Sequence, residues 1–100
     1  MQSSYEASFH REQGFAEADW VRCLPGAVRG AAIDLNTPGR ATVAVGGGWL
    51  TLRWQVLPPR ALGLVRFARL AVDYRFDGVA DEDRHAFMKY FDLYTQRGGG

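Results

Sequence analysis

A glycine run followed by a strictly alternating segment does most to limit what this chain can fold into. Residues 49–56 (WLTLRWQV) alternate apolar and polar side chains, which is typical of a β-strand with one buried face. The β-branched segment 41–45 precedes it, and Gly46, Gly47 and Gly48 separate the two. Three consecutive glycines lose too much backbone entropy to lie inside a regular element. The sequence therefore predicts a hairpin with strands 41–45 and 49–56. Its apolar face would hold Leu50, Leu52, Trp54 and Val56.

Two further strands are expected after this hairpin. Pro58 and Pro59 should end the strand 49–56, because proline has no N–H to donate to a sheet. Residues 61–67 are predicted as a strand whose buried face is ambiguous, since apolar residues occur in both phases. Residues 70–76 (LAVDYRF) alternate clearly and end at an Asp-Gly turn pair. The resulting sheet would have one apolar and one polar face, as antiparallel sheets allow. The polar face would carry Thr51, Arg53, Gln55, Asp73 and Arg75.

The first third of the chain is expected to add two strands and one short helix. Residues 5–10 and 31–35 are predicted as strands, the first because apolar residues recur at every second position. Residues 15–24 are predicted as a short helix whose apolar stripe contains Trp20. The Pro-Gly pair at 25–26 should end that helix.

A C-terminal helix over residues 81–96 is the expected cover for the apolar face of the sheet. Asp81 is a predicted N-cap, and the carboxylates of Glu82 and Asp83 suit the positive end of the helix dipole. Spacings of three and four residues place large apolar side chains on one side of this helix. These side chains are Phe87, Met88, Phe91 and Tyr94.

The predicted fold class is α+β. An antiparallel meander of four to six strands is covered by the C-terminal helix, with the short helix at 15–24 beside it. One hundred residues, 47% hydrophobic and 23% charged, suit one globular domain. We expect that domain to span residues 1–97, with a glycine tail at 98–100.

The order of these elements resembles that of the helix-grip superfamily, which includes START-like and polyketide cyclase-like proteins. The segment Leu24-Pro25-Gly26-Ala27 is similar to a step after the first helix in one family of carbon monoxide dehydrogenase subunits. The resemblance implies a curved antiparallel sheet around a long C-terminal helix, with a cavity between the two. This chain is shorter than that pattern and lacks at least one of its strands.

Charge and cysteine content limit the location and the global partners of the chain. The formal net charge is +1, so no overall field attracts nucleic acid or anionic membranes. Cys23 is the single cysteine, which excludes an intrachain disulfide and a cysteine-based zinc site. The sequence has no apolar run long enough to span a bilayer and no signal-peptide pattern at its start. We therefore expect a cytoplasmic protein without a membrane span.

The residues that most often carry chemistry do not form a recognised motif. His10 and His85 are far apart in the sequence, and neither lies in a metal-binding spacing. Cys23 is expected to be a structural thiol rather than a nucleophile, and the three carboxylates at 81–83 are expected to cap a helix. We therefore assign no catalytic residue, no metal ligand and no cofactor, and an enzyme is the least favoured interpretation.

The first functional hypothesis is a small intracellular binding module for an apolar ligand. Aromatic side chains on the apolar face of the sheet and on the C-terminal helix would line a pocket between the two. The expected lining residues are Trp54, Tyr74, Phe87 and Phe91.

The second hypothesis is an interaction module for nucleic acid or another protein. Five arginines but only one acid, Asp73, occur between residues 53 and 75. Arginines on the polar face of the sheet, with Trp49 nearby for stacking, could bind single-stranded nucleic acid. The expected residues are Arg53, Arg66 and Arg75. Self-association through this face and a merely solvated face are the remaining alternatives.

Overall fold

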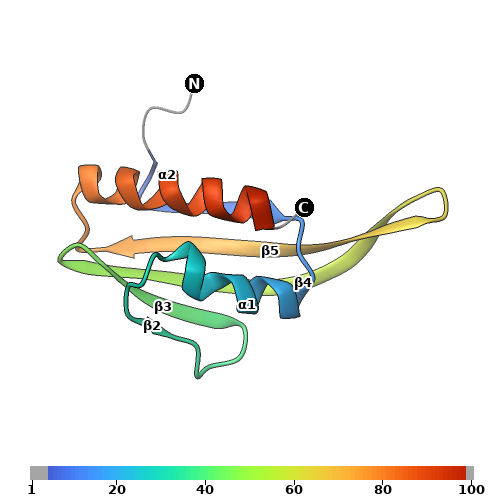
Figure 1. Cartoon of the computed structure of the whole chain (residues 1–100), viewed down its shortest axis with the longest axis horizontal. Helices are drawn as coiled ribbons and strands as arrows, with labels where there is room; N and C mark the ends of the chain where they lie inside the picture. Colours follow the sequence, from blue (N-terminus) through green and yellow to red (C-terminus); the bar gives the residue numbers. More distant parts are fainter. Residues whose placement is uncertain (1–4, 99–100) are drawn as a thin grey trace.

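A computed structural model describes residues 5–98, with side chains described as far as residue 96. It shows one antiparallel sheet and two helices (Figure 1). The elements in chain order are β1 (Ser8–Gln13), α1 (Glu17–Ala27), β2 (Ile33–Asp34), β3 (Arg40–Val45), β4 (Gly48–Leu62), β5 (Val65–Asp77) and α2 (Asp81–Gly98). The α+β class with an antiparallel sheet is confirmed.

The strands are ordered β1-β5-β4-β3-β2 across the sheet, and every neighbouring pair is antiparallel. β2 to β5 form a meander, and β1 pairs with β5, so the first strand lies beside the last. The five strands fall within the predicted four to six.

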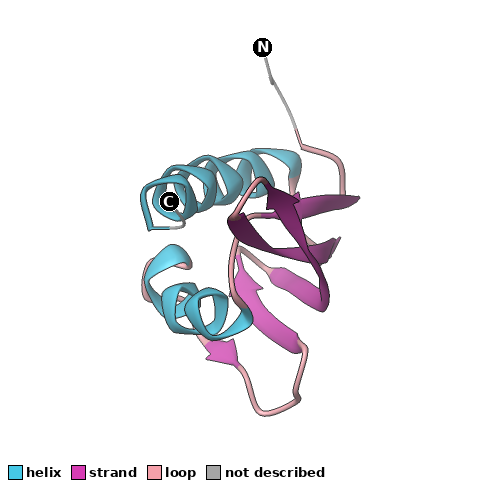
Figure 2. Cartoon of the chain, turned by 90° about the vertical axis from the view of Figure 1, so that its right-hand side faces the viewer, coloured by secondary structure: helices cyan, strands magenta, loops and turns pink. Residues whose placement is uncertain are grey.

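Both helices pack on the same face of the sheet, which leaves the other face open (Figure 2). The C-terminal helix covers the sheet as predicted, but α1 shares the cover beside it. The buried core combines Trp20 and Leu24 from α1 with Met88 and Phe91 from α2. The sheet contributes the apolar phases of β3, β4 and β5, with Val43, Leu50, Leu52, Val72 and Tyr74 among the fully buried side chains.

The β3–β4 turn has the register that the glycine run predicts. Val45 pairs with Gly48, and Gly46 adopts a positive φ of 55° in the turn. Gly48 lies against the start of the β5–α2 connection: a Cβ there would be 2.0 Å from the Asp77 carbonyl oxygen. Position 48 therefore requires glycine because the backbone of another segment occupies the space of a side chain.

The prediction that Pro58 and Pro59 end a strand is wrong. β4 continues through them to Leu62 with an irregular register between Leu57 and Arg60, and it turns at Gly63 into β5. The predicted strand 61–67 is therefore the end of β4, the turn and the start of β5. β3 pairs with β4 only as far as Arg53, so this part of β4 has a neighbouring strand on one side alone. One of the two missing N–H groups faces the open edge, and the other falls in the register irregularity with β5, so neither removes a regular sheet hydrogen bond.

Smaller boundary differences also have physical causes. β1 begins three residues later than predicted, at Ser8. α1 passes through Pro25 to Ala27; a proline in the last turn removes a single helical hydrogen bond. The first bond of α2 is accepted by the Ala80 carbonyl from the Arg84 N–H, which makes Ala80, rather than Asp81, the N-cap.

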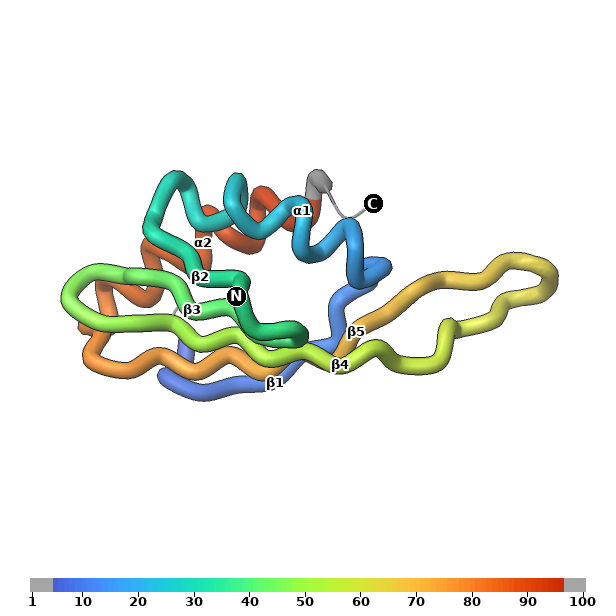
Figure 3. Tube along the Cα trace, turned by 90° about the horizontal axis from the view of Figure 1, so that it is seen from below, coloured from blue at the N-terminus to red at the C-terminus, as the bar shows by residue number. Residues whose placement is uncertain are grey.

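The β4–β5 hairpin extends well beyond the helix-covered core (Figures 1 and 3). We call residues 56–68 of this hairpin the β arm. Trp54 on β4 and Leu70 on β5 are the buried residues nearest to the β arm. Within the arm, Leu57 is partly buried and all other residues are exposed. Val56, expected in the core, is more than half exposed, because it lies beyond the area that the helices cover.

The close approach at Gly48 gives a first prediction. Replacement of Gly48 by Ala should lower the free energy of unfolding by about 2 kcal/mol, because the backbone of Asp77 and Gly78 must move. Thermal denaturation should show a melting temperature lower by roughly 10 °C. Gly47→Ala is the matched control, since a Cβ there would meet open space. Equal melting temperatures for the two variants would contradict the assignment.

Candidate functional site

The four aromatic residues of the first hypothesis lie together between sheet and helices. Trp54, Tyr74 and Phe91 are buried, and Phe87 is partly buried against them. The indole of Trp20 lies between Trp54 and Phe91, with ring centroids 6.0 Å from each. Aromatic packing thus occupies the space where the ligand was expected, and a ligand there stays a prediction.

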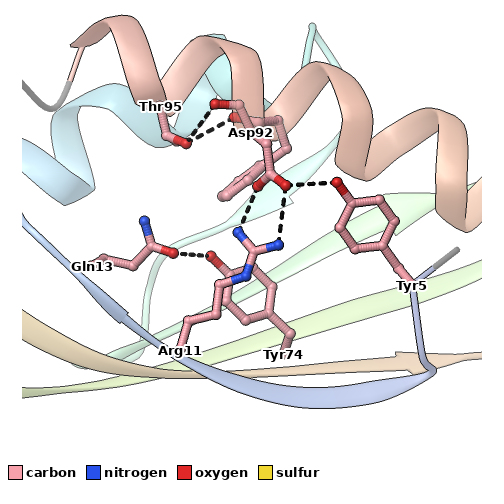
Figure 4. A network of polar contacts seen from close by, with 7 residues as sticks. Tyr5, Arg11, Gln13, Tyr74, Asp92 and Thr95 are labelled. Atoms are coloured by element: carbon pink, nitrogen blue, oxygen red, sulfur yellow. Dashed lines mark hydrogen bonds and ion pairs between the residues drawn. The ribbon is translucent and has the colours of Figure 1, made fainter. Parts of the chain in front are cut away.

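A polar network joins β1 to α2 beside this aromatic packing (Figure 4). The two Nη atoms of Arg11 donate to the carboxylate of Asp92, at 2.7 Å to Oδ1 and 3.0 Å to Oδ2. The Tyr5 hydroxyl donates to Oδ2 at 2.7 Å, and the Tyr74 hydroxyl donates to Gln13 Oε1 at 2.9 Å. The Arg11 guanidinium also stacks 5.3 Å from the Tyr74 ring centroid. Asp92 of α2 accepts from both Tyr5 and Arg11, while the Tyr74–Gln13 bond joins β5 to β1. The network therefore ties the sheet to α2.

The open face of the sheet carries a second polar set. Thr51, Arg53, Gln55, Asp73 and Arg75 alternate with buried residues of β4 and β5, and alternation puts them all on the side without helices. The register places Arg53 directly opposite Asp73 on one side and directly opposite Arg40 of β3 on the other. Two exposed arginines on neighbouring strands therefore face each other.

Two of the acids on this face contact partners other than Arg40 and Arg53. The Asp73 carboxylate accepts from His10 Nδ1 at 2.7 Å, and Arg75 Nε lies 3.5 Å from Asp77 Oδ2. Within residues 5–96, no ion pair is found for Arg40 or Arg53. The hollows of this face are lined by three arginines and by three acids, Asp34, Asp73 and Asp77. What distinguishes the face is therefore the pair of guanidinium groups without an ion pair among the described residues, and not an excess of positive charge.

Two adjoining hollows run across this face. One, of about 450 Å³, has Arg53, Asp73 and Arg75 in its lining. The other, of about 530 Å³, is lined in part by Ile33 and Trp49. The two share Arg40, Thr51 and Asp77. Trp49 is 55% exposed, so the hollows together present an aromatic side chain next to the arginines.

The structure brings together only part of the predicted arginine set. Arg53 and Arg75 share the open face, whereas Arg66 pairs with Ala61 in the β arm. Alternation from Arg75 puts Arg66 on the other side of β5. Arg40 belongs to the site but was missed from the sequence. The glycine turn could have revealed it. If Val45 pairs with Gly48 across the turn, counting pairs away from the turn along both strands places Arg40 opposite Arg53.

Cys23 and the metal-ligating side chain types form no further site among the described residues. Cys23 is half-buried, and burial, reinforced by Asp19, raises the pKa of its thiol, which disfavours the nucleophilic thiolate. Across the described part of the chain, no three His, Cys, Asp or Glu side chains are grouped so as to hold a metal ion. Neither described helix is long and apolar enough to cross a membrane.

Comparison with known proteins finds no matching family model, no matching curated protein and no matching solved structure. The resemblance to the helix-grip superfamily therefore stays a prediction.

The buried tyrosine of the polar network predicts alkaline sensitivity. Burial, chiefly, raises the pKa of Tyr74, so folding favours the protonated phenol. Stability from this group is complete below the pKa of an unfolded tyrosine and is lost as the pH rises above about 10.

Urea denaturation at neutral pH and above pH 10 measures that loss. Tyr74→Phe should unfold more easily at neutral pH, since it lacks the bond to Gln13, but should lose less stability at high pH than the native chain. Tyr94→Phe, at an exposed position, is the control. An unchanged pH dependence in Tyr74→Phe would contradict the assignment.

Proposed function

We propose that this protein is a small non-catalytic module that binds single-stranded nucleic acid on the open face of its sheet. The observation that carries the proposal is the direct opposition of Arg40 and Arg53. Like charges in directly opposed positions destabilise a sheet. A bound phosphate between the two guanidinium groups would convert this repulsion into two charge-assisted contacts.

The surroundings of the arginine pair favour a bound anion as its partner rather than a carboxylate of the chain itself. Asp73 lies opposite Arg53 in the register, yet its carboxylate bonds to His10 on the far side. Arg75 adds a third cation to the same hollow. Arginine presents a planar fork that suits phosphate oxygens, which makes this cluster a natural phosphate site.

Trp49 extends the argument from phosphate to nucleic acid. Its exposed indole lines the hollow that adjoins the arginines. Proteins that bind single strands combine a cationic groove for the backbone with aromatic rings on which bases stack. The open face presents the two arginines without an ion pair to any described residue, and the exposed tryptophan, on adjoining hollows.

The proposal predicts how affinity for a short single-stranded oligonucleotide depends on salt and on these residues. Contacts from Arg40, Arg53 and Arg75 to three phosphates give a logarithmic slope of about −2 against salt concentration. Arg53→Ala should reduce the magnitude of that slope by roughly 0.7. Trp49→Ala should weaken binding about tenfold or more at any salt concentration through lost stacking. Fluorescence anisotropy measures each quantity.

Arg66→Ala is the matched control, because it removes the same charge from the β arm rather than from the open face. Its affinity should stay close to that of the native chain. Equal losses in Arg66→Ala and Arg53→Ala would show that total charge, and not the arranged face, drives binding. Affinity that does not change with salt would exclude phosphate recognition altogether.

A further inference from the structure

The β arm exposes apolar side chains that no other segment within residues 5–96 covers. Leu64 at its tip is fully exposed, and the other large apolar residues named here are at least half exposed. They are Val56, Leu62, Val65 and Phe67. Four of these five side chains fall within residues 62–67 around the tip. A two-stranded hairpin is marginal in water without a covering layer, and exposed apolar residues close together mark an interaction site.

The charges of the arm select among its potential partners. Residues 55–72 contain Arg60, Arg66 and Arg69 but no acid. Glu12 of β1 pairs with Arg60 and Arg69 near the base of the arm. Within the part of the chain that the structure describes, no ion pair is found for Arg66. The end of the arm is thus apolar and cationic.

A second copy of the chain fits this surface poorly. Two arms packed side by side would bring their arginines together without acids between them, and that repulsion opposes association. The Pro58-Pro59 pair also removes an N–H donor from the open β4 edge of the arm, which discourages strand addition there. The favoured partner is therefore both apolar and anionic.

We infer that the β arm inserts its tip into the surface of an anionic lipid bilayer. A bilayer presents negative headgroups above an apolar layer. The arm presents arginines along its length and apolar side chains at its tip, so its arginines would meet the headgroups and its tip the apolar layer. Arg66 lies two residues from Leu64, and strands rise about 3.4 Å per residue. Its guanidinium can therefore reach headgroup phosphates while Leu64 lies at the acyl boundary, within the ~5–10 Å depth of interfacial insertion.

Backbone geometry allows insertion to this depth only. Leu62 pairs with Val65, and Gly63 adopts the positive φ of 63° that closes the turn between them. The tip thus exposes few unpaired backbone groups. Deeper insertion would bring the open edges of β4 and β5 into hydrocarbon, where unpaired N–H and C=O groups are costly.

Co-sedimentation with vesicles tests the inference. The full chain should bind vesicles of mixed phosphatidylserine and phosphatidylcholine, and bind pure phosphatidylcholine vesicles far less. Leu64→Ser combined with Val65→Ser should weaken binding to the mixed vesicles about tenfold or more. Both positions are exposed, so the melting temperature should not change. Leu93→Ser removes an equally apolar, exposed side chain from α2 and should bind like the native chain.

Three results would overturn the inference. One is no binding to the mixed vesicles by the native chain. Another is unchanged vesicle binding by the double tip variant. If Arg53→Ala then abolishes vesicle binding, the lipid contacts the open sheet face instead of the arm. The third is a native dimer in sedimentation velocity that the double tip variant converts to monomers, because the arm would then be a self-association surface.

Discussion

The packing of both helices on one face of the sheet is the constraint on which the rest of the structure depends. The buried indole of Trp20 is central to it, since its ring contacts Phe15, Trp54 and Phe91 from three other parts of the chain. Large aromatic side chains bury more apolar area than any others. Because α1 and α2 share this cover, the alternate side chains of β3, β4 and β5 remain in water.

The open face and the β arm are two consequences of this one-sided cover. On the open face, no helix limits which side chains the strands carry, and two opposed arginines persist there at a cost in stability. Such local conflicts are expected at functional sites. Beyond Trp54 and Leu70 the helices no longer cover the β4–β5 hairpin, so its apolar residues stay available to a partner.

The strands 49–56 and 70–76 could be predicted because one-sided burial leaves a period of two in the sequence. The path of the chain through Pro58 and Pro59 could not, because nothing local shows that these residues lie at an edge. The opposition of Arg40 and Arg53 could have been predicted from the register of the glycine turn. Arg66 was grouped with Arg53 and Arg75 because the three are close in sequence, but it lies in the β arm. Trp20 was placed on an apolar stripe, but its contacts depend on how α1 and α2 lie side by side.

The tryptophan side-chain signals of a ¹H–¹⁵N correlation spectrum test the central claim most directly. Trp49 lies in the hollow of the open face, while Trp20 and Trp54 are buried on the other side of the sheet. When a short single-stranded oligonucleotide is added, the account predicts a progressive shift of the Trp49 indole N–H and little change in the other two. A Trp49 signal that stays in place while the oligonucleotide binds would contradict the account.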